Sequence, residues 1–168
     1  MNILETQRLA LRELSRGDEA FILELLNEPG FLNNIGDRGV RTLEDARGYI
    51  ANSAVASYEK NGFGLYRTAL KETDVAIGIC GLVKRDGLDH PDIGFAFLER
   101  FWGRGYAQES AGAVLRHAHA ALSLRRLLAI TAPDNRASMQ VLEKLGFRFE
   151  RFVKLPGHVA QSRLFARE

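Results

Sequence analysis

The sequence is short of the features that mark several large classes of protein. Among its 168 residues there is one cysteine, Cys80, and there are four prolines. A single cysteine cannot form an internal disulfide and does not provide a metal cluster. No segment is repeated, of low complexity or similar to a linker. These absences exclude a disulfide scaffold and a repeat protein.

Long apolar runs and a strong net charge are also missing. No apolar run approaches the roughly 18 residues that a membrane span requires. The first five residues, MNILE, lack a basic region followed by an apolar one, so they do not resemble a signal peptide. The formal net charge is +2, too small to indicate nucleic acid by itself. We therefore expect a cytoplasmic protein that binds neither membranes nor nucleic acid.

What is present is an ordinary soluble composition, with 46% hydrophobic and 26% charged residues. A chain of this length fits one domain with a sizeable core, so we expect residues 1–168 to form a single domain. Hydrophobic periodicity and turn signals predict an alternation of strands and helices. The expected strands are 4–14, 63–70, 75–84, 92–98, 126–132, 147–155 and 159–166, and the expected helices are 18–28, 42–60, 107–122 and 136–145, with a loop over 31–41.

One short stretch, FWGRGYAQE at residues 101–109, stands between an expected strand and an expected helix. Gly103 and Gly105 flank Arg104 where the helix begins. The first N–H groups of a helix lack internal partners and carry partial positive charge. Small residues let an anion approach these groups, which predicts a phosphate-binding loop, although two such glycines also suit a plain tight turn. The stretch matches neither a P-loop nor the GxGxxG dinucleotide signature, because Gln108 stands where the third glycine would be.

The segment WGRGYA at residues 102–107 resembles the acetyl-coenzyme A loop, [QR]-x-x-G-x-[GA], of the GNAT superfamily of N-acetyltransferases. Tryptophan at its first position is similar to the branch of ribosomal-protein-alanine N-acetyltransferases, which reads W-G-x-G-Y-A-x-E. Two further motifs resemble the same branch: TQRL with LREL near the N-terminus, and NRAS followed by LGF at residues 135–147. The expected order of elements also equals the GNAT order.

The resemblance implies a fold of the α/β (α+β) class. Its sheet is mixed, mostly antiparallel and seven-stranded, with helices on both faces and splayed central strands. It also implies an enzyme that moves the acetyl group of acetyl-coenzyme A to a primary amine by direct attack in a ternary complex. No metal is expected, and the assembly would be a monomer or a homodimer.

Coenzyme-binding residues follow from the family motifs. Backbone amides would bind the pyrophosphate, with the Arg104 side chain reaching phosphate oxygens. Backbone groups of Phe95 and Phe97 would bind the amide-bearing arm like an added strand, while their rings pack in the core. Asn135 would bind the arm, or simply cap its helix. The pyrophosphate loop comprises Gly103, Arg104, Gly105, Tyr106, Ala107 and Gln108.

Two residues are catalytic candidates. Many relatives have a tyrosine seven residues after the asparagine, but Leu142 stands there, so the resemblance points instead to Ser138 beside the departing thiolate. Ser138 also suits a plain surface position on its helix. Asp92, at the start of the strand that feeds the loop, is the best candidate for the base that deprotonates the amine, or else an exposed strand-end carboxylate. Lesser base candidates are His90, Glu13 and Glu109.

The acceptor amine is the least determined part of the prediction. The resemblance favours the α-amine of a protein or peptide, yet a free amino acid, a polyamine or a drug stays open. The loop over 31–41, the second helix and the final hairpin would wall its site. Two rival functions are a non-catalytic acyl-coenzyme A sensor and an RNA-associated protein that uses Arg125, Arg126, Arg148 and Arg151.

Overall fold

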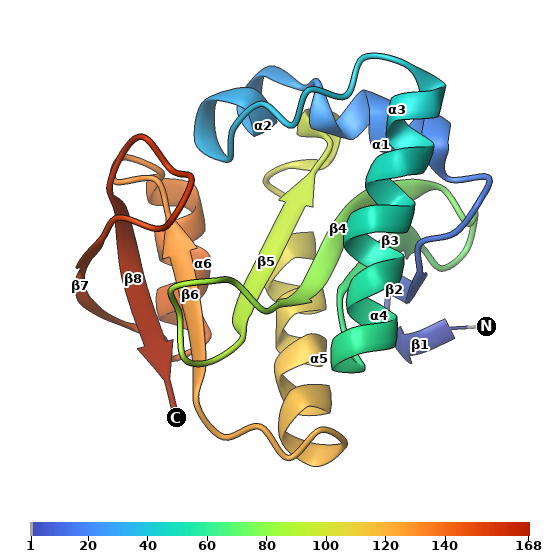
Figure 1. Cartoon of the computed structure of the whole chain (residues 1–168). Helices are drawn as coiled ribbons and strands as arrows, with labels where there is room; N and C mark the ends of the chain where they lie inside the picture. Colours follow the sequence, from blue (N-terminus) through green and yellow to red (C-terminus); the bar gives the residue numbers. More distant parts are fainter. Residues whose placement is uncertain (1) are drawn as a thin grey trace.

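The computed structural model describes residues 2–168, which form an open sheet of eight strands with helices on both faces (Figure 1). The spatial order is β1-β2-β3-β4-β5-β6-β8-β7. Neighbouring strands pair antiparallel except β5 and β6, which pair parallel. The strands are β1 (Asn2–Glu5), β2 (Leu9–Glu13), β3 (Leu65–Leu70), β4 (Ala76–Val83), β5 (Asp92–Phe97), β6 (Leu127–Thr131), β7 (Arg148–Val153) and β8 (Ser162–Arg167).

The predicted count of seven strands is wrong, because the strand expected over residues 4–14 is two strands. A turn at Thr6 separates β1 from β2: its N–H donates to the Leu9 carbonyl at 2.8 Å, and its hydroxyl accepts the Leu9 N–H at 2.9 Å. The two halves then pair antiparallel, with Leu4 opposite Leu11. Neither glycine nor proline marks this turn, so the alternating pattern runs through it unbroken.

The helical segments that the structure describes also depart from expectation at one point. The loop predicted over 31–41 begins as helix α2, and Pro29, expected to stop a helix, is its first residue, where a missing N–H costs nothing. The expected helix over 42–60 is a continuous helical segment made of α3, η1 and α4, and a Thr42–Asp45 capping box caps its N-terminus. The segments are α1 (Glu19–Leu26), α2 (Pro29–Asn34), α3 (Leu43–Tyr49), the π-helical η1 (Ile50–Val55), α4 (Ala56–Asn61), the 3-10 turn η2 (Glu99–Phe101), α5 (Tyr106–Ala120) and α6 (Arg136–Lys144).

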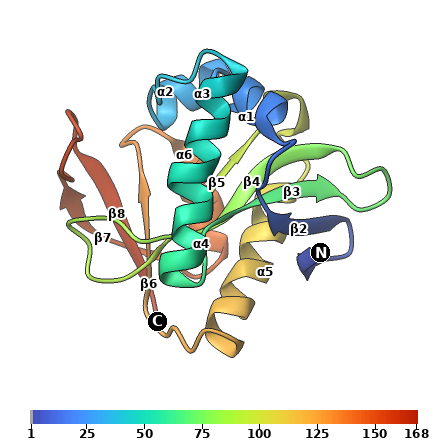
Figure 2. The same ribbon diagram turned by 45° about the vertical axis from the view of Figure 1, so that its right-hand side comes forward.

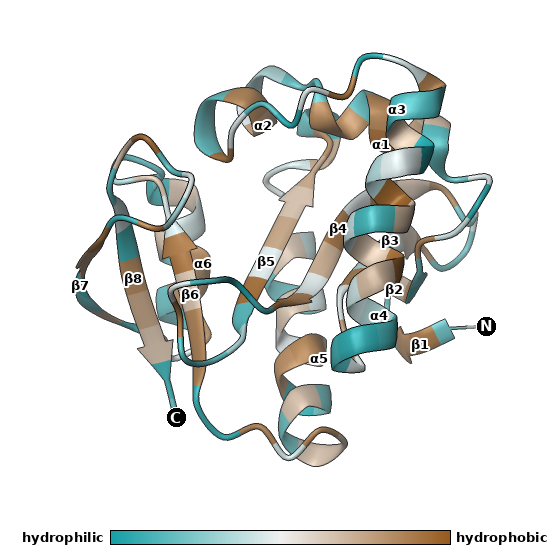
Figure 3. Cartoon of the chain, viewed as in Figure 1, coloured by the Kyte–Doolittle hydropathy of each residue, from teal (hydrophilic) through white to brown (hydrophobic). Residues whose placement is uncertain are grey.

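Two hydrophobic clusters divide the helices between the faces of the sheet (Figures 1 and 2). Helix α5 packs its apolar side, including Ala111, Val114 and Ala118, against one face. Helices α1 to α4 cover the other face through a separate cluster that includes Ile22 and Ile50. Figure 3 shows the hydrophobic colour gathered on β4, β5, β6 and β8. Within residues 2–168 no helix is long and apolar enough to cross a membrane.

The central strands β5 and β6 separate along their length, as predicted. They share one register pair, Asp92 with Leu128, and the Leu128 N–H donates to the Pro91 carbonyl at 3.0 Å. Beyond this point the two ribbons diverge toward their carboxyl ends (Figure 1). The splay therefore opens at the end of β5 that leads into residues 101–109.

Candidate functional site

The edge of β5 that faces β6 carries unused backbone groups. Leu98 N–H donates to the Ile77 carbonyl at 2.9 Å, which makes Phe97 and its partner Gly78 a non-hydrogen-bonded pair. By alternation, Phe95 and Phe97 direct their N–H and C=O groups away from β4, into the splay. Apart from the pair at Asp92, no described strand pairs with β5 on this side. These groups can therefore bind an extended, amide-bearing ligand as an added strand would.

Trp102 occupies one of these groups. Its indole N–H donates to the Phe97 carbonyl at 2.8 Å, while its ring lies against α2, where a Cβ on Gly30 would come within 2.5 Å of it. The Gly30 N–H in turn donates to Glu99 Oε1 at 2.8 Å. The N–H and C=O groups of Phe95 and the N–H group of Phe97 remain available to a ligand. Trp102 also connects the start of the glycine loop to α2.

The glycine loop has the backbone conformation that an anion site requires. Gly103 has φ +74° and Gly105 has φ +81°, a region that other residues adopt at a cost. Gly105 is the N-cap of α5 and has no side chain to cap the helix. The first helical bond runs from Glu109 N–H to the Gly105 carbonyl at 3.0 Å. Within the described chain, the N–H groups of Tyr106, Ala107 and Gln108 therefore have no partner and can bind an anion.

Two arginines stand beside this loop, and sequence reasoning identified one of them. Arg104 is exposed, with its guanidinium carbon 5.8 Å from the centre of the Phe101 ring. Arg8, which was missed, lies 4.4 Å from the centre of the Tyr106 ring, and its Nη2 is 3.5 Å from the place that a Cβ on Gly105 would take. The TQRL motif was the one sequence signal for it, because the two positions are about a hundred residues apart.

Glu109 holds Arg8 in place through its carboxylate. Its carboxylate accepts hydrogen bonds from Arg8 Nε at 2.7 Å, from the Arg8 N–H at 3.0 Å and from the Thr6 hydroxyl. Burial alone would raise the pKa of Glu109, but these hydrogen bonds outweigh it and hold the pKa below its ordinary value. A carboxylate held ionised by three donors is a structural tie between the β1–β2 turn and α5.

An open pocket of about 380 Å³ adjoins the loop along α5. Its volume lies within the usual range for small-molecule sites, about 300–1,000 Å³. Arg116 offers a positive charge at the end far from the loop. The lining residues are Gly105, Gln108, Glu109, Gly112, Arg116 and Leu145.

Asn135 and Ser138 lie at the start of α6. Asn135 caps the helix, since its Oδ1 accepts the Ser138 N–H at 3.3 Å. Its side-chain NH₂ has no hydrogen-bond partner in the described part of the chain. The Ser138 hydroxyl is half-buried and likewise makes no hydrogen bond to any residue of 2–168. Leu142, at the position where many relatives have tyrosine, is buried in the core.

Thr131, the last residue of β6, is a second residue that sequence reasoning missed. It is 6% exposed, and its hydroxyl oxygen has no hydrogen-bond partner among residues 2–168. Among residues 2–168 no other buried side-chain nitrogen or oxygen is left unpaired. A threonine in a strand carries no signal in the sequence, because strands favour this residue in any case.

Asp92 lies at the closed end of the splay, away from the glycine loop. Five residue steps separate it from Phe97, about 17 Å of extended strand. Its carboxylate is 0% exposed and accepts from Arg85 Nε at 3.0 and 3.1 Å. Burial raises the pKa of Asp92 to about 6, against the opposing charge and hydrogen bond of Arg85. The expectation of an exposed strand-end carboxylate is therefore wrong, and the group has the pKa of a base that works near neutral pH.

Three basic side chains come from three different loops: Arg38 precedes α3, Arg85 lies between β4 and β5, and His158 lies between β7 and β8. Burial, together with the charges of Arg85 and Arg38, lowers the pKa of His158. The neighbouring Asp37 and Arg41 neutralise one another at 2.6 Å, whereas Arg38 makes no ion pair within residues 2–168. We call Arg38, Arg85 and His158 the basic rim. Within residues 2–168 its unpaired positive charge is that of Arg38, because Arg85 is paired with Asp92 and the lowered pKa of His158 favours its neutral form.

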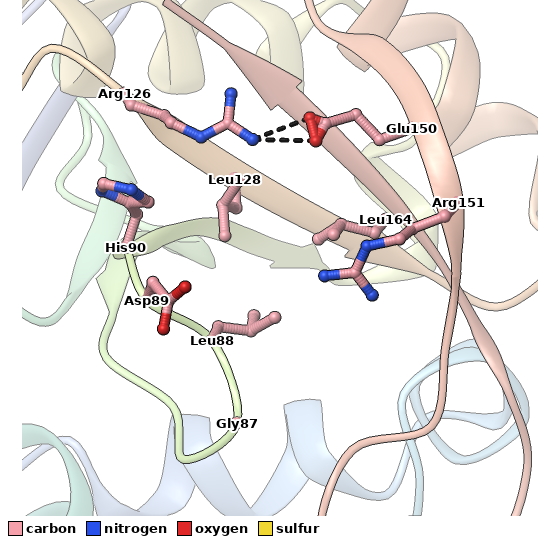
Figure 4. A pocket seen from close by; sticks show the side chains of 9 residues that line it. All are labelled: Gly87, Leu88, Asp89, His90, Arg126, Leu128, Glu150, Arg151 and Leu164. Atoms are coloured by element: carbon pink, nitrogen blue, oxygen red, sulfur yellow. Dashed lines mark hydrogen bonds and ion pairs between the residues drawn. The ribbon is translucent and has the colours of Figure 1, made fainter.

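A second, smaller pocket of about 110 Å³ lies beneath the β4–β5 loop (Figure 4). Arg126 crosses one side of it and meets the Glu150 carboxylate at 2.7 and 2.8 Å. The same guanidinium also pairs with Glu168 at 2.6 Å. His90, one of the lesser base candidates, lines this pocket rather than the splay. The carboxylates of Glu150 and Glu168 offset the positive charge of Arg126.

Nucleophilic and metal chemistry find little support in the described chain. Cys80 is fully buried, and burial raises the pKa of its thiol to about 12, so it stays protonated. Within residues 2–168, His, Cys, Asp and Glu side chains form no group of three or more that is placed to hold a metal ion.

Comparison with known proteins gives a consistent result. Residues 8–148 match the acetyltransferase (GNAT) domain family. An uncharacterised N-acetyltransferase of Bacillus subtilis, YnaD, is 30% identical over 151 residues, which is 90% of this chain and 85% of that protein. An acetyltransferase structure from Agrobacterium tumefaciens superposes with a TM-score of 0.83 at 26% identity, covering 98% of this chain and 93% of its own. RimL, a ribosomal L7/L12 α-N-protein acetyltransferase in complex with coenzyme A, superposes with a TM-score of 0.84 at 19% identity, covering 99% and 97%.

Proposed function

Since this chain belongs to the GNAT family of acetyl-CoA-dependent N-acetyltransferases, we propose that it acetylates the α-amine of a peptide or protein by direct attack in a ternary complex. The observation that carries the proposal is the unpaired β5 edge that ends in an uncapped helix N-terminus. Together they provide amide partners for an extended arm and N–H donors for a pyrophosphate, in that order along the chain.

The coenzyme then runs antiparallel to the direction of β5. Its pyrophosphate binds the N–H groups from Gly103 to Gln108, with the guanidinium groups of Arg104 and Arg8 beside it. Its arm continues along Phe97 and Phe95 and receives a hydrogen bond from the Asn135 NH₂. This path brings the thioester toward Asp92. The pocket that ends at Arg116 offers room for the nucleotide end.

The reaction needs a neutral amine. The amine nitrogen attacks the thioester carbonyl, its proton passes to Asp92 directly or through one water, and the C–S bond breaks as the amide forms. At pH 7, deprotonation costs about 1 kcal/mol for an α-amine and roughly 4.6 kcal/mol for a lysine. A base with a pKa of about 6 is matched to the smaller of these costs, which supports an α-amine as the acceptor.

The departing thiolate needs little help. A thiol has an ordinary pKa of about 8.5, whereas a serine hydroxyl is a poor acid. In our proposal the Ser138 hydroxyl donates a hydrogen bond to the sulfur, and the proton comes from water. Ser138→Ala is therefore expected to lower kcat by about 3- to 10-fold with little change in KM, on the scale of one net hydrogen bond. Steady-state kinetics test this, and a loss above about 1,000-fold would instead make Ser138 an obligatory acid.

The basic rim favours an acceptor that carries an acidic group. Arg38, which has no acidic partner within residues 2–168, repels a polycation and attracts a carboxylate near the amine. We expect peptides that begin Ala-Asp or Ser-Glu to have at least about 10-fold higher kcat/KM than peptides that begin Ala-Lys, and than spermidine. The activity named for one neighbour in fold, RimL, is also on a protein α-amine.

Release of coenzyme A with such a peptide panel tests both the proposed function and the acceptor class. Arg38→Gln is expected to reduce the preference for acidic peptides while leaving acetyl-CoA binding unchanged. If spermidine or lysine-rich peptides are the best acceptors, the assignment of an acidic acceptor is wrong. If no amine turns over while the coenzyme binds, the chain is a coenzyme sensor rather than an enzyme.

A further inference from the structure

Thr131 closes β6 on the side of the sheet that carries α5 and α6. Leu127 and Ala129, in alternate positions of the same strand, pack into the cluster beneath α5. Leu128 and Ile130 belong to a different cluster on the opposite face. By the same alternation, the Thr131 side chain lies on the α5–α6 face. Helix α5, which follows the glycine loop, packs on this same face.

The surroundings of Thr131 along the chain already belong to the proposed coenzyme site. One residue later, the Ala132 carbonyl accepts the N–H of Asn135 at 3.1 Å, in the turn that starts α6. At this level β6 has left β5, since their only described pairing is at Asp92 and Leu128. Thr131 is therefore at the open end of the splay, beside Asn135 and across from the free β5 edge.

A buried hydroxyl without a partner is rare, because its desolvation is not compensated. Within residues 2–168, the N–H groups of the pyrophosphate loop, the β5 edge apart from the Phe97 carbonyl, and the Asn135 NH₂ also lack partners in this region, and each has a proposed coenzyme group to bind. We propose that Thr131 is a further positioning residue, whose hydroxyl donates a hydrogen bond to an amide carbonyl of the coenzyme arm. This inference rests on the proposed function, because it requires coenzyme to bind between β5 and β6.

Thr131→Val provides a test with two readouts of opposite sign. Valine has the same shape but no hydroxyl, so the unliganded protein is expected to melt at the same or a higher temperature, as the unpaired group is removed. Coenzyme A is expected to bind about 10-fold more weakly, the loss of one hydrogen bond. Thr131→Ser keeps the hydroxyl and is expected to bind within about 3-fold of wild type.

A nucleotide without the arm separates this effect from a general change in the site. Adenosine 3′,5′-bisphosphate lacks the arm and is expected to bind Thr131→Val and wild type equally. If the variant binds coenzyme A as wild type does, or loses affinity for the bisphosphate to the same extent, Thr131 does not contact the arm. If wild type itself binds the bisphosphate but gains nothing from the arm, the proposed binding path along β5 fails as well.

Discussion

Gly105→Val is expected to weaken acetyl-CoA binding by at least about 100-fold, or 2.7 kcal/mol, while the protein still folds. Gly105 has φ +81°, and a Cβ there would meet nothing closer than Arg8 Nη2 at 3.5 Å. The chain itself therefore has room for the side chain, at a backbone cost of about 1–2 kcal/mol. The bound coenzyme leaves no such room, because the branched side chain would lie among the N–H groups that bind the pyrophosphate. If the backbone relaxed to relieve the strained φ, those N–H groups would point away from the pyrophosphate.

Gly62→Val is the matched control for this variant. Gly62 caps the end of α4 with φ +79°, and a Cβ there would meet nothing within 4 Å. The two variants should lose similar melting temperature, yet Gly62→Val should bind acetyl-CoA as wild type does. Calorimetric titration of both decides the matter. Equal affinity of Gly105→Val and wild type would show that this helix N-terminus does not bind the coenzyme.

Asp92→Asn is expected to lower kcat/KM by about 100-fold or more, the usual contribution of a general base. Asparagine keeps the shape of the side chain but cannot accept the amine proton. The folded pKa of Asp92 is about 6, above its ordinary value of 3.8, so the carboxylate gains its proton as pH falls through 6. Protonation of Asp92 should accordingly add a further loss of activity below pH 6, beyond the loss that protonation of the amine causes at any pH below 8.

The pH profile of kcat/KM separates catalysis from a purely structural ion pair. With an α-amine of pKa near 8, the logarithmic slope should be about 1 between pH 6 and pH 8 and about 2 below pH 6, where base and amine are both protonated. In Asp92→Asn the break near pH 6 should vanish. Asp86→Asn, an exposed carboxylate in the adjoining loop, should keep the profile of wild type. If Asp92→Asn is less stable but keeps the break near pH 6, Asp92 is only the structural ion-pair partner of Arg85 and not the base.

The glycine loop and the splay could be predicted because their chemistry is local or family-wide. Gly103 and Gly105, at a strand-to-helix junction, predict a left-handed backbone conformation, and both residues adopt it. The strands around β5 have continuous apolar runs with turn residues between them, so their order along the chain could be predicted from the sequence. The separation of β5 from β6 was predicted from the family motifs. Hydrophobic periodicity could not predict it, because it depends on how two strands diverge in space.

What the sequence did not show depends on contacts between distant residues. The β1–β2 turn is held by Thr6 and by its contact with Glu109, which lies on another element. Arg8 reaches the start of α5 from the β1–β2 turn, and the unpaired hydroxyl of Thr131 can be recognised only when every neighbour is known. Asp92 was placed on its strand correctly, but its burial and its bond to Arg85 depend on how the β4–β5 loop folds back.

Titration of the wild-type protein with acetyl-CoA by calorimetry tests the central claim most directly. We predict one site per chain with a dissociation constant in the micromolar range, about 8 kcal/mol of binding free energy. Coenzyme A should bind at the same site with similar affinity, because the loop, the β5 edge and Asn135 contact parts that both molecules share. A folded sample that binds neither molecule would contradict the account and leave the chain with the fold of the family but not its coenzyme site.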